Sequence, residues 1–458
     1  MEKIQFIFIL ACFSLLPAYG QDIDCADPEN SEFNTKDIYT FSTIDNVTFA
    51  EAKNWIGEME VLKAKTNYPG LFNAANPVKR PTICLFHGGG FRGQDTKNSP
   101  LMLLLQDYFY KKGFLVVTPD YRQGWEGSDG FCGTGTIEGF EDAQYRSFQD
   151  SRALVRFLKA KANTLGVDTN NIFLFGSSAG GINIINFLAN EHTLSTPDRV
   201  QRLGSLDNYG NSYRYSTQVK GMVTAVASTV DLRNIQRNIP LMMIHGTCDN
   251  AVPFGEGRLV DCPNLSYMFG SYWINKKMDD LGFDSELHAF CGFGHDIGSQ
   301  NDDPNGNKPS FNYLTTQASK FIFTLLCEEE WDFEDKIAND FINSSPADSC
   351  TNFEFYELCS RNQPISEFKV GIFPNYISSI DRTYIKVISN SSQELKAEIY
   401  DLYGKKRWEK SYLIDIGFNA FQENFDFLQA GPHIIIFYKN SIRTDIQKFL
   451  VRSPLVKY

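Results

Sequence analysis

The chain has 458 residues, of which 42% are hydrophobic, 14% aromatic and 21% charged, so it fits a protein with an apolar core and not a largely disordered one. Its net charge of −12 gives no support for nucleic-acid binding, which favours a basic face. The length allows about three average domains, or one large and one small domain.

The first 20 residues have the pattern of a secretory signal peptide. Lys3 provides a positive start, residues 4–17 are almost wholly apolar, and Ala18 and Gly20 place small residues at the cleavage positions. We expect the mature chain to begin at Gln21 and to be exported. No later stretch has the about 18 uninterrupted apolar residues of a membrane helix, so we expect no transmembrane segment.

Short apolar runs alternate with segments of helical periodicity over residues 21–328, the expected first domain. The expected strands are Pro81–Phe86, Gly113–Tyr121, Ile172–Phe175, Gly221–Ala227, Pro240–Ile244 and Ser285–Phe290. The expected helices are Phe148–Asn163, Ile182–Ala189, Tyr267–Leu281 and Tyr313–Cys327. Glu58–Ala64 fits either an edge strand or a short helix. This alternation predicts the α/β class, with a mostly parallel sheet covered by helices on both faces.

The pattern changes after residue 328. Residues 329–369 are polar and acidic, and we expect them to form a linker. From residue 370 to residue 458, short alternating segments separated by turns predict a small antiparallel β-sandwich that is independent of the first domain. Its expected strands are Thr383–Ser389, Leu395–Leu402, His433–Tyr438 and Asp445–Val451.

The strongest functional signal is the G-x-S-x-G sequence of residues 176–180. It follows the buried strand Ile172–Phe175 and precedes a helix, which is the context of a nucleophile elbow. Ser178 is therefore expected at a strained turn, with its hydroxyl exposed above the sheet. Glycine is expected at positions 176 and 180 because side chains there would collide across the turn.

Two later strands supply the partners that a nucleophile for acyl transfer needs. Asp249 follows the strand Pro240–Ile244, and His295 lies in a glycine-rich loop after the strand Ser285–Phe290. The chain order Ser, Asp, His is the order expected for this fold. We expect His295 to take the hydroxyl proton of Ser178, and Asp249 to fix the tautomer of the imidazole.

The backbone N–H groups of Gly89, Gly90 and Ala179 are expected to form the oxyanion hole. The first two lie in a histidine and glycine run directly after the strand Pro81–Phe86. Glycine at these positions lets the substrate carbonyl approach the backbone closely. No C-x-x-C pair or histidine cluster indicates a metal site, and we expect neither a metal nor another cofactor.

Other titratable residues compete for two of these roles. Asp231 also follows a strand, and Asp296 neighbours His295, but the position of Asp249 fits the acid better. His87 is expected to hold the glycine loop rather than to act as the base.

Nine cysteines follow the expected signal peptide, so at least one has no partner within the chain. Export favours disulfides, and Cys84, in an apolar strand, is the expected free thiol. A Cys248–Cys291 disulfide would hold the loops of the acid and the base together, whereas Cys248–Cys262 would join residues closer in sequence. The sequence leaves this choice open.

Three segments resemble the carboxylesterase and hormone-sensitive-lipase-like branches of the α/β-hydrolase superfamily: His87-Gly88-Gly89-Gly90-Phe91, Gln149–Leu154 and Gly176-Ser177-Ser178-Ala179-Gly180. The resemblance covers about residues 80–325 and implies an α/β-hydrolase fold with esterase activity. The chain departs from the lipase branch by having Ser177 where that branch often has Asp, and by showing no clear cap.

The C-terminal region resembles the type A sorting domain of the Bacteroidetes type IX secretion system. The matching segments are Phe373-Pro374-Asn375 and residues 399–405, 428–431 and 447–451, with His433 in place of the usual Tyr. The resemblance implies an export address that the secretion machinery recognises and that does no chemistry. It also implies a secreted or cell-surface protein, exported through the periplasm of one of the Bacteroidetes.

Together these features predict a secreted serine esterase that hydrolyses carboxylic esters through an acyl-enzyme on Ser178. Aryl, acetylated-sugar and polyester esters are the candidate substrates. The expected partners are the ester substrate and the secretion machinery, with no nucleic acid. The alternative from another class is a catalytically silent surface adhesion protein with a hydrolase fold, although such proteins normally lose the nucleophile or the base.

Overall fold

The computed structural model describes most of the chain between residues 40 and 451. The described residues are 40–93, 97–127, 135–189, 194–262, 265–290, 293–295, 297, 309–328, 333, 335–337, 369–373, 376–377, 383–389, 392–414, 417–425, 427–439 and 442–451. The chain forms two compact units that divide between Phe353 and Glu354. The expected signal peptide at residues 1–20 lies outside the described residues, as does most of the expected linker.

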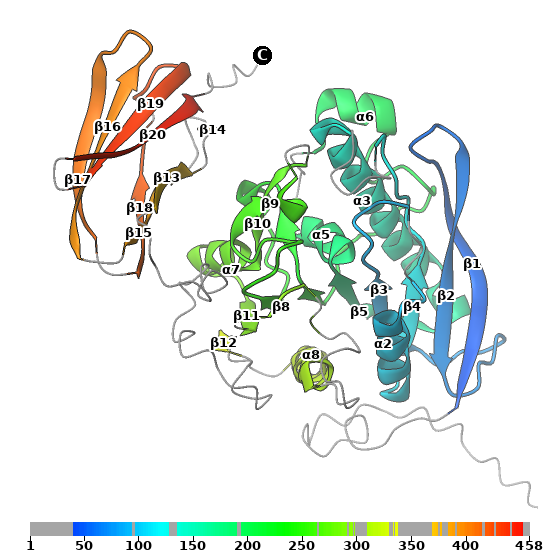
Figure 1. Ribbon diagram of the computed structural model, residues 1–458. Coiled ribbons are helices and arrows are strands. Elements are labelled where there is room, and N and C mark those ends of the chain that lie inside the picture. Colours follow the sequence, from blue (N-terminus) through cyan, green and yellow to red (C-terminus); the bar gives the residue numbers. More distant parts are fainter. Residues whose placement is uncertain are drawn as a thin grey trace, which may run out of the picture. The chain divides into compact units, whose positions relative to one another are not determined.

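The first unit is built on a nine-stranded sheet in the order β1-β2-β4-β3-β5-β6-β8-β11-β12 (Figure 1). Its strands are β1 (Phe41–Lys53), β2 (Met59–Pro69), β3 (Arg80–Phe86), β4 (Leu115–Pro119), β5 (Val167–Ser177), β6 (Gly221–Ala225), β8 (Leu241–Gly246), β11 (Ser285–Phe290) and β12 (Lys336–Ile337). Strands β4 to β12 of this order run parallel, and β1 and β2 are antiparallel to their neighbours. This order and these directions are those of the α/β-hydrolase fold, as the sequence predicted.

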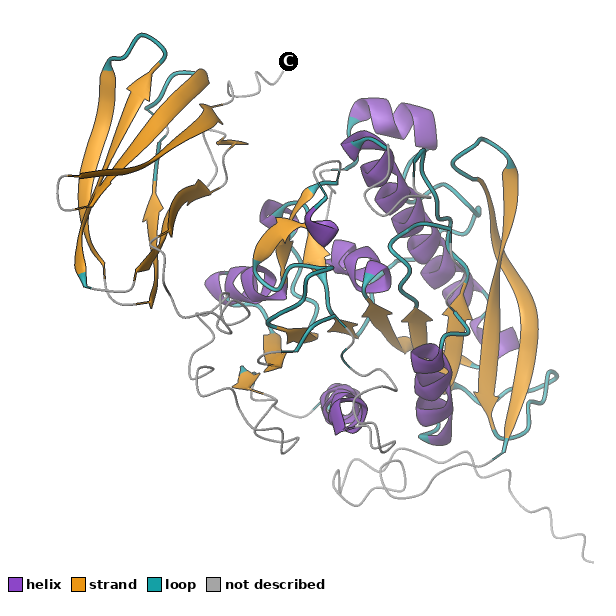
Figure 2. Cartoon of the chain, in the orientation of Figure 1, coloured by secondary structure: helices purple, strands orange, loops and turns teal. Residues whose placement is uncertain are grey.

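Helices cover both faces of the sheet (Figure 2). They are α2 (Pro100–Lys111), α3 (Ile137–Ala160), α4 (Ala162–Leu165), α5 (Ala179–Ile185), α6 (Pro197–Leu203), α7 (Ser271–Asp280) and α8 (Pro309–Cys327), with short 3-10 turns η1 (Asn186–Leu188), η2 (Leu232–Asn234) and η3 (Leu259–Asp261). Helices α2 and α8 share one buried apolar cluster with the central strands. All six residues of β8 are buried, as expected for a parallel strand covered on both faces.

The parallel strands end at one edge of the sheet, and a small second sheet lies in the loops beyond that edge. Its strands are β7 (Ser228–Thr229), β10 (Tyr267–Gly270) and β9 (Glu256–Arg258), in that order.

None of the helices in the described part of the chain is long and apolar enough to cross a membrane.

The second unit consists of two sheets that share one apolar core. Sheet order is β13-β15-β18 in one and β14-β20-β19-β16-β17 in the other. The strands are β13 (Lys369–Phe373), β14 (Tyr376–Ile377), β15 (Thr383–Ser389), β16 (Gln393–Asp401), β17 (Lys406–Ile414), β18 (Gly417–Glu423), β19 (Gly431–Lys439) and β20 (Ile442–Val451). All pairs are antiparallel except β14 with β20. Residues such as Ile385 and Ile435 bring the two sheets into one core, which makes the unit a β-sandwich.

Several elements differ from the sequence-based expectation. Residues 267–270 are the strand β10 rather than the start of a helix, because they pair with β7 and β9 before α7 begins. Helix α2 was not expected, since apolar residues fill positions 101–105 and 108–110 and do not mark a single face of a helix. The undecided segment Glu58–Ala64 belongs to β2, and β12 lies within the range expected to be linker.

Candidate active site

Ser178 lies at the tight turn between β5 and α5. Its backbone has φ 55° and ψ −120°, a conformation that non-glycine residues rarely adopt. The N–H of Ser178 donates to the carbonyl of Ala225 at 2.9 Å, and its carbonyl accepts from the N–H of Ile182 at the same distance. The turn is therefore strained but fixed on both sides, which is the geometry of a nucleophile elbow.

The glycines around this turn are required by close backbone contacts. A Cβ atom on Gly176 would overlap the carbonyl of Gly180, so the collision across the turn is as expected. A Cβ on Gly180 would instead overlap the carbonyl of Phe86, at the end of β3. The second glycine is therefore needed for packing of α5 against the neighbouring strand rather than for the turn itself.

The structure brings Ser178, His295 and Asp249 together from three separate loops. The hydroxyl Oγ of Ser178 lies 3.0 Å from Nε2 of His295, and Nδ1 of His295 lies 2.8 Å from Oδ2 of Asp249. The carboxylate of Asp249 is fully buried, whereas the side chain of His295 is 26% exposed. The acid of this row is thus shielded from solvent, whereas the imidazole is partly open to it.

Backbone hydrogen bonds join the loop that carries Asp249 to the loop that carries His295. The N–H of Thr247 donates to the carbonyl of Phe290 at 3.0 Å, and the N–H of Cys248 donates to the carbonyl of Phe293 at 2.8 Å. Gly246 has no side chain to hold these loops apart, since a Cβ there would overlap the carbonyls of residues 293 and 294. The distance between acid and base is therefore set by main-chain contacts.

The cysteines of this region are only partly described. Cys248, Cys262 and Cys327 are disulfide-bonded, and Cys84 is free and buried, as expected. The candidate partner Cys291 lies outside the described residues.

Asp249 is held by four hydrogen bonds. Its Oδ1 accepts from the backbone N–H groups of Ala251 at 2.8 Å and Val252 at 2.9 Å. Its Oδ2 is shared by His295 and His245, the latter at 3.2 Å. Burial alone would raise the pKa of Asp249, but the hydrogen bonds from the two imidazoles hold that pKa well below its ordinary value. The carboxylate is therefore ionised at neutral pH.

The competing candidates have other contacts. Asp231 forms an ion pair with Arg233 at 2.7 Å and caps the turn η2, and Asp296 lies outside the described residues. His87 stacks on Tyr121, with ring centroids 4.6 Å apart, and its Nδ1 lies 2.8 Å from the carbonyl of Gly88. These contacts agree with the expectation that His87 holds the glycine loop.

A cavity of about 260 Å³ opens beside Ser178 and His295, and Gly89, Gly90 and Ala179 line it. The two glycines have φ of 112° and 63°, in the left-handed region that side chains disfavour. The three residues predicted to supply the oxyanion hole are thus adjacent to the serine hydroxyl, at the N-terminus of α5 and in the loop after β3.

The walls of this cavity are largely apolar and come from segments that the sequence analysis did not assign to the site. The lining includes Phe91, Trp125, Phe140, Ile182, Ala251, Val252, Leu259, Val260 and Leu265, with Arg92 as a charged member. Five of these residues lie within residues 251–265, between β8 and β10. In the sequence, these residues appear as a few apolar positions on either side of Cys262. They follow no helical or strand periodicity, so the sequence alone does not predict that they line the cavity.

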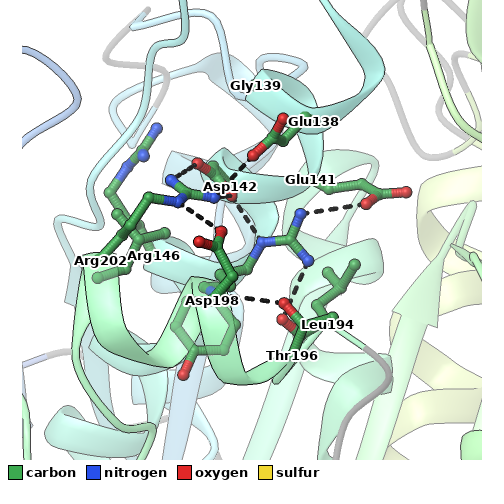
Figure 3. A network of polar contacts seen from close by, with 12 residues as sticks. Glu138, Gly139, Glu141, Asp142, Arg146, Leu194, Thr196, Asp198 and Arg202 are labelled. Atoms are coloured by element: carbon green, nitrogen blue, oxygen red, sulfur yellow. Dashed lines mark hydrogen bonds and ion pairs between the residues drawn. The ribbon is translucent and has the colours of Figure 1, made fainter.

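A network of ion pairs joins α6 to α3 (Figure 3). Arg199 and Arg202 of α6 each lie 2.6 Å from a carboxylate oxygen of Asp142. Arg199 also contacts Glu141, and Glu141 accepts a hydrogen bond from the hydroxyl of Ser266 at 3.2 Å. Because Phe140 and Leu265 are the neighbours of Glu141 and Ser266, the network holds two parts of the cavity wall together.

Among the residues that the structure describes, no group of three or more His, Cys, Asp or Glu side chains is arranged to hold a metal ion. The described site itself places an alcohol in line with an imidazole and a carboxylate, beside backbone amides at the start of a helix.

Comparison of the chain with known proteins gave one family match and several similar solved structures. Residues 71–238 match the BD-FAE family model, which describes an esterase and lipase family of α/β-hydrolase type. No curated protein sequence is significantly similar to the chain.

Among solved structures, the chain is similar to esterase 2 of Thermogutta terrifontis phosphoramylated by tabun, with 18% identity over 63% of this chain and 96% of that one and a TM-score of 0.41. It is also similar to the propionate-bound form of the same esterase, with 19% identity over 60% and 93% and a TM-score of 0.40. The family match and the side-chain geometry both indicate a carboxylic ester hydrolase.

Proposed function

We propose that the protein is a serine esterase that hydrolyses carboxylic esters through a covalent acyl-enzyme on Ser178. The observation that supports this most strongly is the continuous alignment from Ser178 through His295 to Asp249, at 3.0 Å and 2.8 Å. The family match over residues 71–238, which ends before Asp249 and His295, supports the same reaction independently.

Each side chain has a defined part in the reaction. His295 Nε2 accepts the proton of the Ser178 hydroxyl as Oγ attacks the ester carbonyl, and later returns it to the leaving alcohol. The buried carboxylate of Asp249 keeps the hydrogen of His295 on Nδ1 and stabilises the imidazolium. In the second half of the reaction, His295 takes a proton from water as the water oxygen attacks the acyl carbonyl. Ser178 Oγ then leaves with that proton, and the carboxylic acid is released.

The oxyanion of the tetrahedral intermediate is placed among the N–H groups of Gly89, Gly90 and Ala179. Loss of one such donor typically costs about 3 kcal/mol in the barrier. The helix α5 starts at Ala179, so its N-terminal dipole points toward the same position and favours negative charge there.

The cavity bears on which group of the ester lies next to Ser178, for any of the aryl, acetylated-sugar and polyester candidates. Its walls are mostly apolar and include the rings of Trp125 and Phe140, and its volume is about 260 Å³. An apolar wall favours an apolar group next to the scissile bond, because burial of that group removes apolar surface from water. We therefore propose that the group bound in this cavity is a short alkyl or aryl group.

Hydrolysis of p-nitrophenyl acetate and butyrate by wild type and by Ser178→Ala tests the reaction. We expect the serine variant to lose at least about 10⁴-fold in kcat while it keeps the wild-type melting temperature. Equal rates for the two proteins would contradict the esterase and would leave the silent adhesion protein as the better reading. A panel of esters that varies the acyl group and the alcohol separately would then identify the group that occupies the cavity.

We further propose that the second unit is an export address that brings the enzyme to the cell surface or the medium. Support comes from the sequence resemblance to a type A sorting domain, and a β-sandwich at residues 369–451 is compatible with it. Deletion of residues 370–458 in the native host should leave the esterase in the periplasm. An unchanged level of activity in the medium would contradict this role.

A further inference from the structure

One buried histidine beside the proposed triad has no part in the reaction as described above. His245 lies near the end of β8 and has no exposed surface. Its Nε2 is 3.2 Å from Oδ2 of Asp249, the oxygen that His295 also contacts, and 3.1 Å from the carbonyl oxygen of Val252. Both neighbours of Nε2 are acceptors, so the hydrogen-bond partners assign a hydrogen to this nitrogen.

The other ring nitrogen of His245 faces a hydroxyl. Nδ1 lies 2.8 Å from Oγ of Ser271, and this Oγ lies 3.3 Å from the carbonyl oxygen of Ala227. Both ring nitrogens of His245 thus have hydrogen-bond partners, and Nε2 is the one that donates to Asp249.

His245 differs from the other donors to Asp249 in where it is held. Ala251 and Val252 belong to the same loop as Asp249, and His295 must take up and release protons during turnover. His245 belongs to the sheet, since β8 pairs in parallel with β11 and residue 245 lies opposite residue 289. It is thus the one described donor to Asp249 that joins the carboxylate directly to a central strand.

We propose that His245 is a positioning residue: it holds the Asp249 carboxylate in the orientation that keeps Oδ2 on His295 Nδ1. The inference rests on the proposed function, because it gives His245 a role in the reaction of Ser178. A continuous set of contacts then runs from Ser271 through His245, Asp249 and His295 to Ser178, and Asp249 is fixed from both sides.

Two substitutions at the same position separate orientation from packing. His245→Leu removes the donor to Asp249, whereas His245→Gln keeps an amide N–H that can reach Oδ2. Both lose the contact between Nδ1 and Ser271, so we expect both to melt at similarly lowered temperatures. On p-nitrophenyl butyrate, we expect kcat to fall about 10- to 100-fold in the Leu variant and less than about fivefold in the Gln variant, with KM unchanged within about twofold.

His288→Gln is the matched control. His288 is also a fully buried histidine of the central sheet, on β11, and its Nδ1 lies 2.7 Å from the hydroxyl of Tyr313 on α8. We expect this variant to melt at a lower temperature but to keep the kcat of the wild type. A kcat loss in His288→Gln equal to that of His245→Leu would mean that any buried polar change in the sheet lowers turnover, and would overturn the proposal.

A measurement on the wild type is independent of how the variants fold. Imidazole ¹⁵N chemical shifts at neutral pH should show His245 with a hydrogen on Nε2, with the resonance assigned by its loss in His245→Gln. A ring with its only hydrogen on Nδ1 would overturn the proposal.

The outcomes also distinguish this inference from the esterase itself. If wild type is active, Ser178→Ala is inactive and His245→Leu keeps the wild-type kcat, the esterase stands and the role of His245 is wrong. If His245→Leu and His245→Gln lose kcat equally at equal melting temperature, the donor to Asp249 is not what matters and the proposal is likewise wrong. Equal rates for wild type and Ser178→Ala would contradict both the esterase and the role of His245.

Discussion

Two buried carboxylates in the first unit, Asp249 and Asp150, have opposite pKa shifts. Burial raises the pKa of Asp150 above its ordinary value even though the guanidinium of Arg122 lies against it, with Nε 2.9 Å from Oδ1. At Asp249 the hydrogen bonds from two imidazoles outweigh burial and lower the pKa. The comparison teaches that the pKa of a buried carboxylate depends on whether its partners outweigh the effect of burial, as they do at Asp249 but not at Asp150.

The partners differ in what they can do with a proton. A guanidinium is not a group that exchanges protons at accessible pH, and that of Arg122 also bonds to the side chain of Gln149 and the carbonyl of Lys53. It therefore fixes α3 to the loop after β4 permanently. An imidazole can accept and release a proton near neutral pH, so in the proposed reaction the contact of His295 with Asp249 changes during turnover. We expect loss of the first carboxylate to affect folding and loss of the second to affect rate.

The largest effect is expected for Asp249→Asn. The amide would face Nδ1 of His295 with its NH₂ group and stabilise the wrong tautomer, so kcat should fall about 10⁴-fold. Ester hydrolysis by the purified variant, with circular dichroism to show that it is folded, measures this. Retention of more than a tenth of wild-type turnover would contradict the assignment of Asp249.

Asp150→Asn is the converse experiment. It leaves the buried Arg122 without a compensating charge, which should reduce the free energy of unfolding by about 3–5 kcal/mol. Turnover by the fraction that remains folded should stay within about threefold of wild type. Urea denaturation and rate measurements on the same sample test both parts, and wild-type stability in this variant would show that the pair is not important for folding.

A smaller effect on stability is expected at the glycine that packs α5 against β3. Gly180→Ala should cost about 1–3 kcal/mol and reduce turnover as well, because its Cβ would overlap the carbonyl of Phe86 and shift the elbow. Gly257→Ala is the control, since a Cβ there makes only an ordinary contact with Pro253, 3.5 Å away. Thermal melts and ester hydrolysis rates of both variants test this prediction. If Gly180→Ala keeps the melting temperature and the rate of Gly257→Ala, and both match wild type, α5 can move without loss.

The smallest effect concerns pH. Asp249 has a lowered pKa, so its contribution to stability is complete above the unfolded carboxyl pKa of about 3.9 and is lost only as the pH falls below that value. Above it, Asp249 stays ionised, so in the proposed mechanism acidification lowers activity by adding a proton to the general base. The logarithm of kcat/KM should therefore rise with pH with a slope of one, about tenfold per unit.

A slope of two between pH 5 and 7 would mean that a second group must also lose a proton. That result would contradict the permanent ionisation of Asp249. The rate profile of wild type in buffers of constant ionic strength is sufficient for the comparison.

Much of the fold and the proposed site could be predicted because the relevant signals are local. Ser178 stands in a strand, turn and helix pattern, and Asp249 and His295 each follow a short apolar strand. Parallel strands end at one edge of the sheet, so three loops that are far apart in sequence meet there. The free buried Cys84 followed from the same apolar strand pattern.

The rest depends on contacts between distant segments. Nothing local shows that Gly180 packs on Phe86, or that residues 251–265 form a cavity wall. Helix α2 was missed because its apolar residues include Leu103, which is exposed, as well as those of the buried face. The sequence analysis gave His245 no role, because its proposed role depends on contacts such as the one with Ser271, which follows 26 residues later on α7.

The central claim is that Ser178 is the nucleophile, activated by His295 and Asp249. A fluorophosphonate reacts covalently with an activated serine, and intact-mass and peptide analysis locate the product. We predict one adduct per chain on Ser178 in the wild type, none in Ser178→Ala, and slow labelling in Asp249→Asn. Labelling of a different residue, or no labelling of a preparation that hydrolyses esters, would contradict the account.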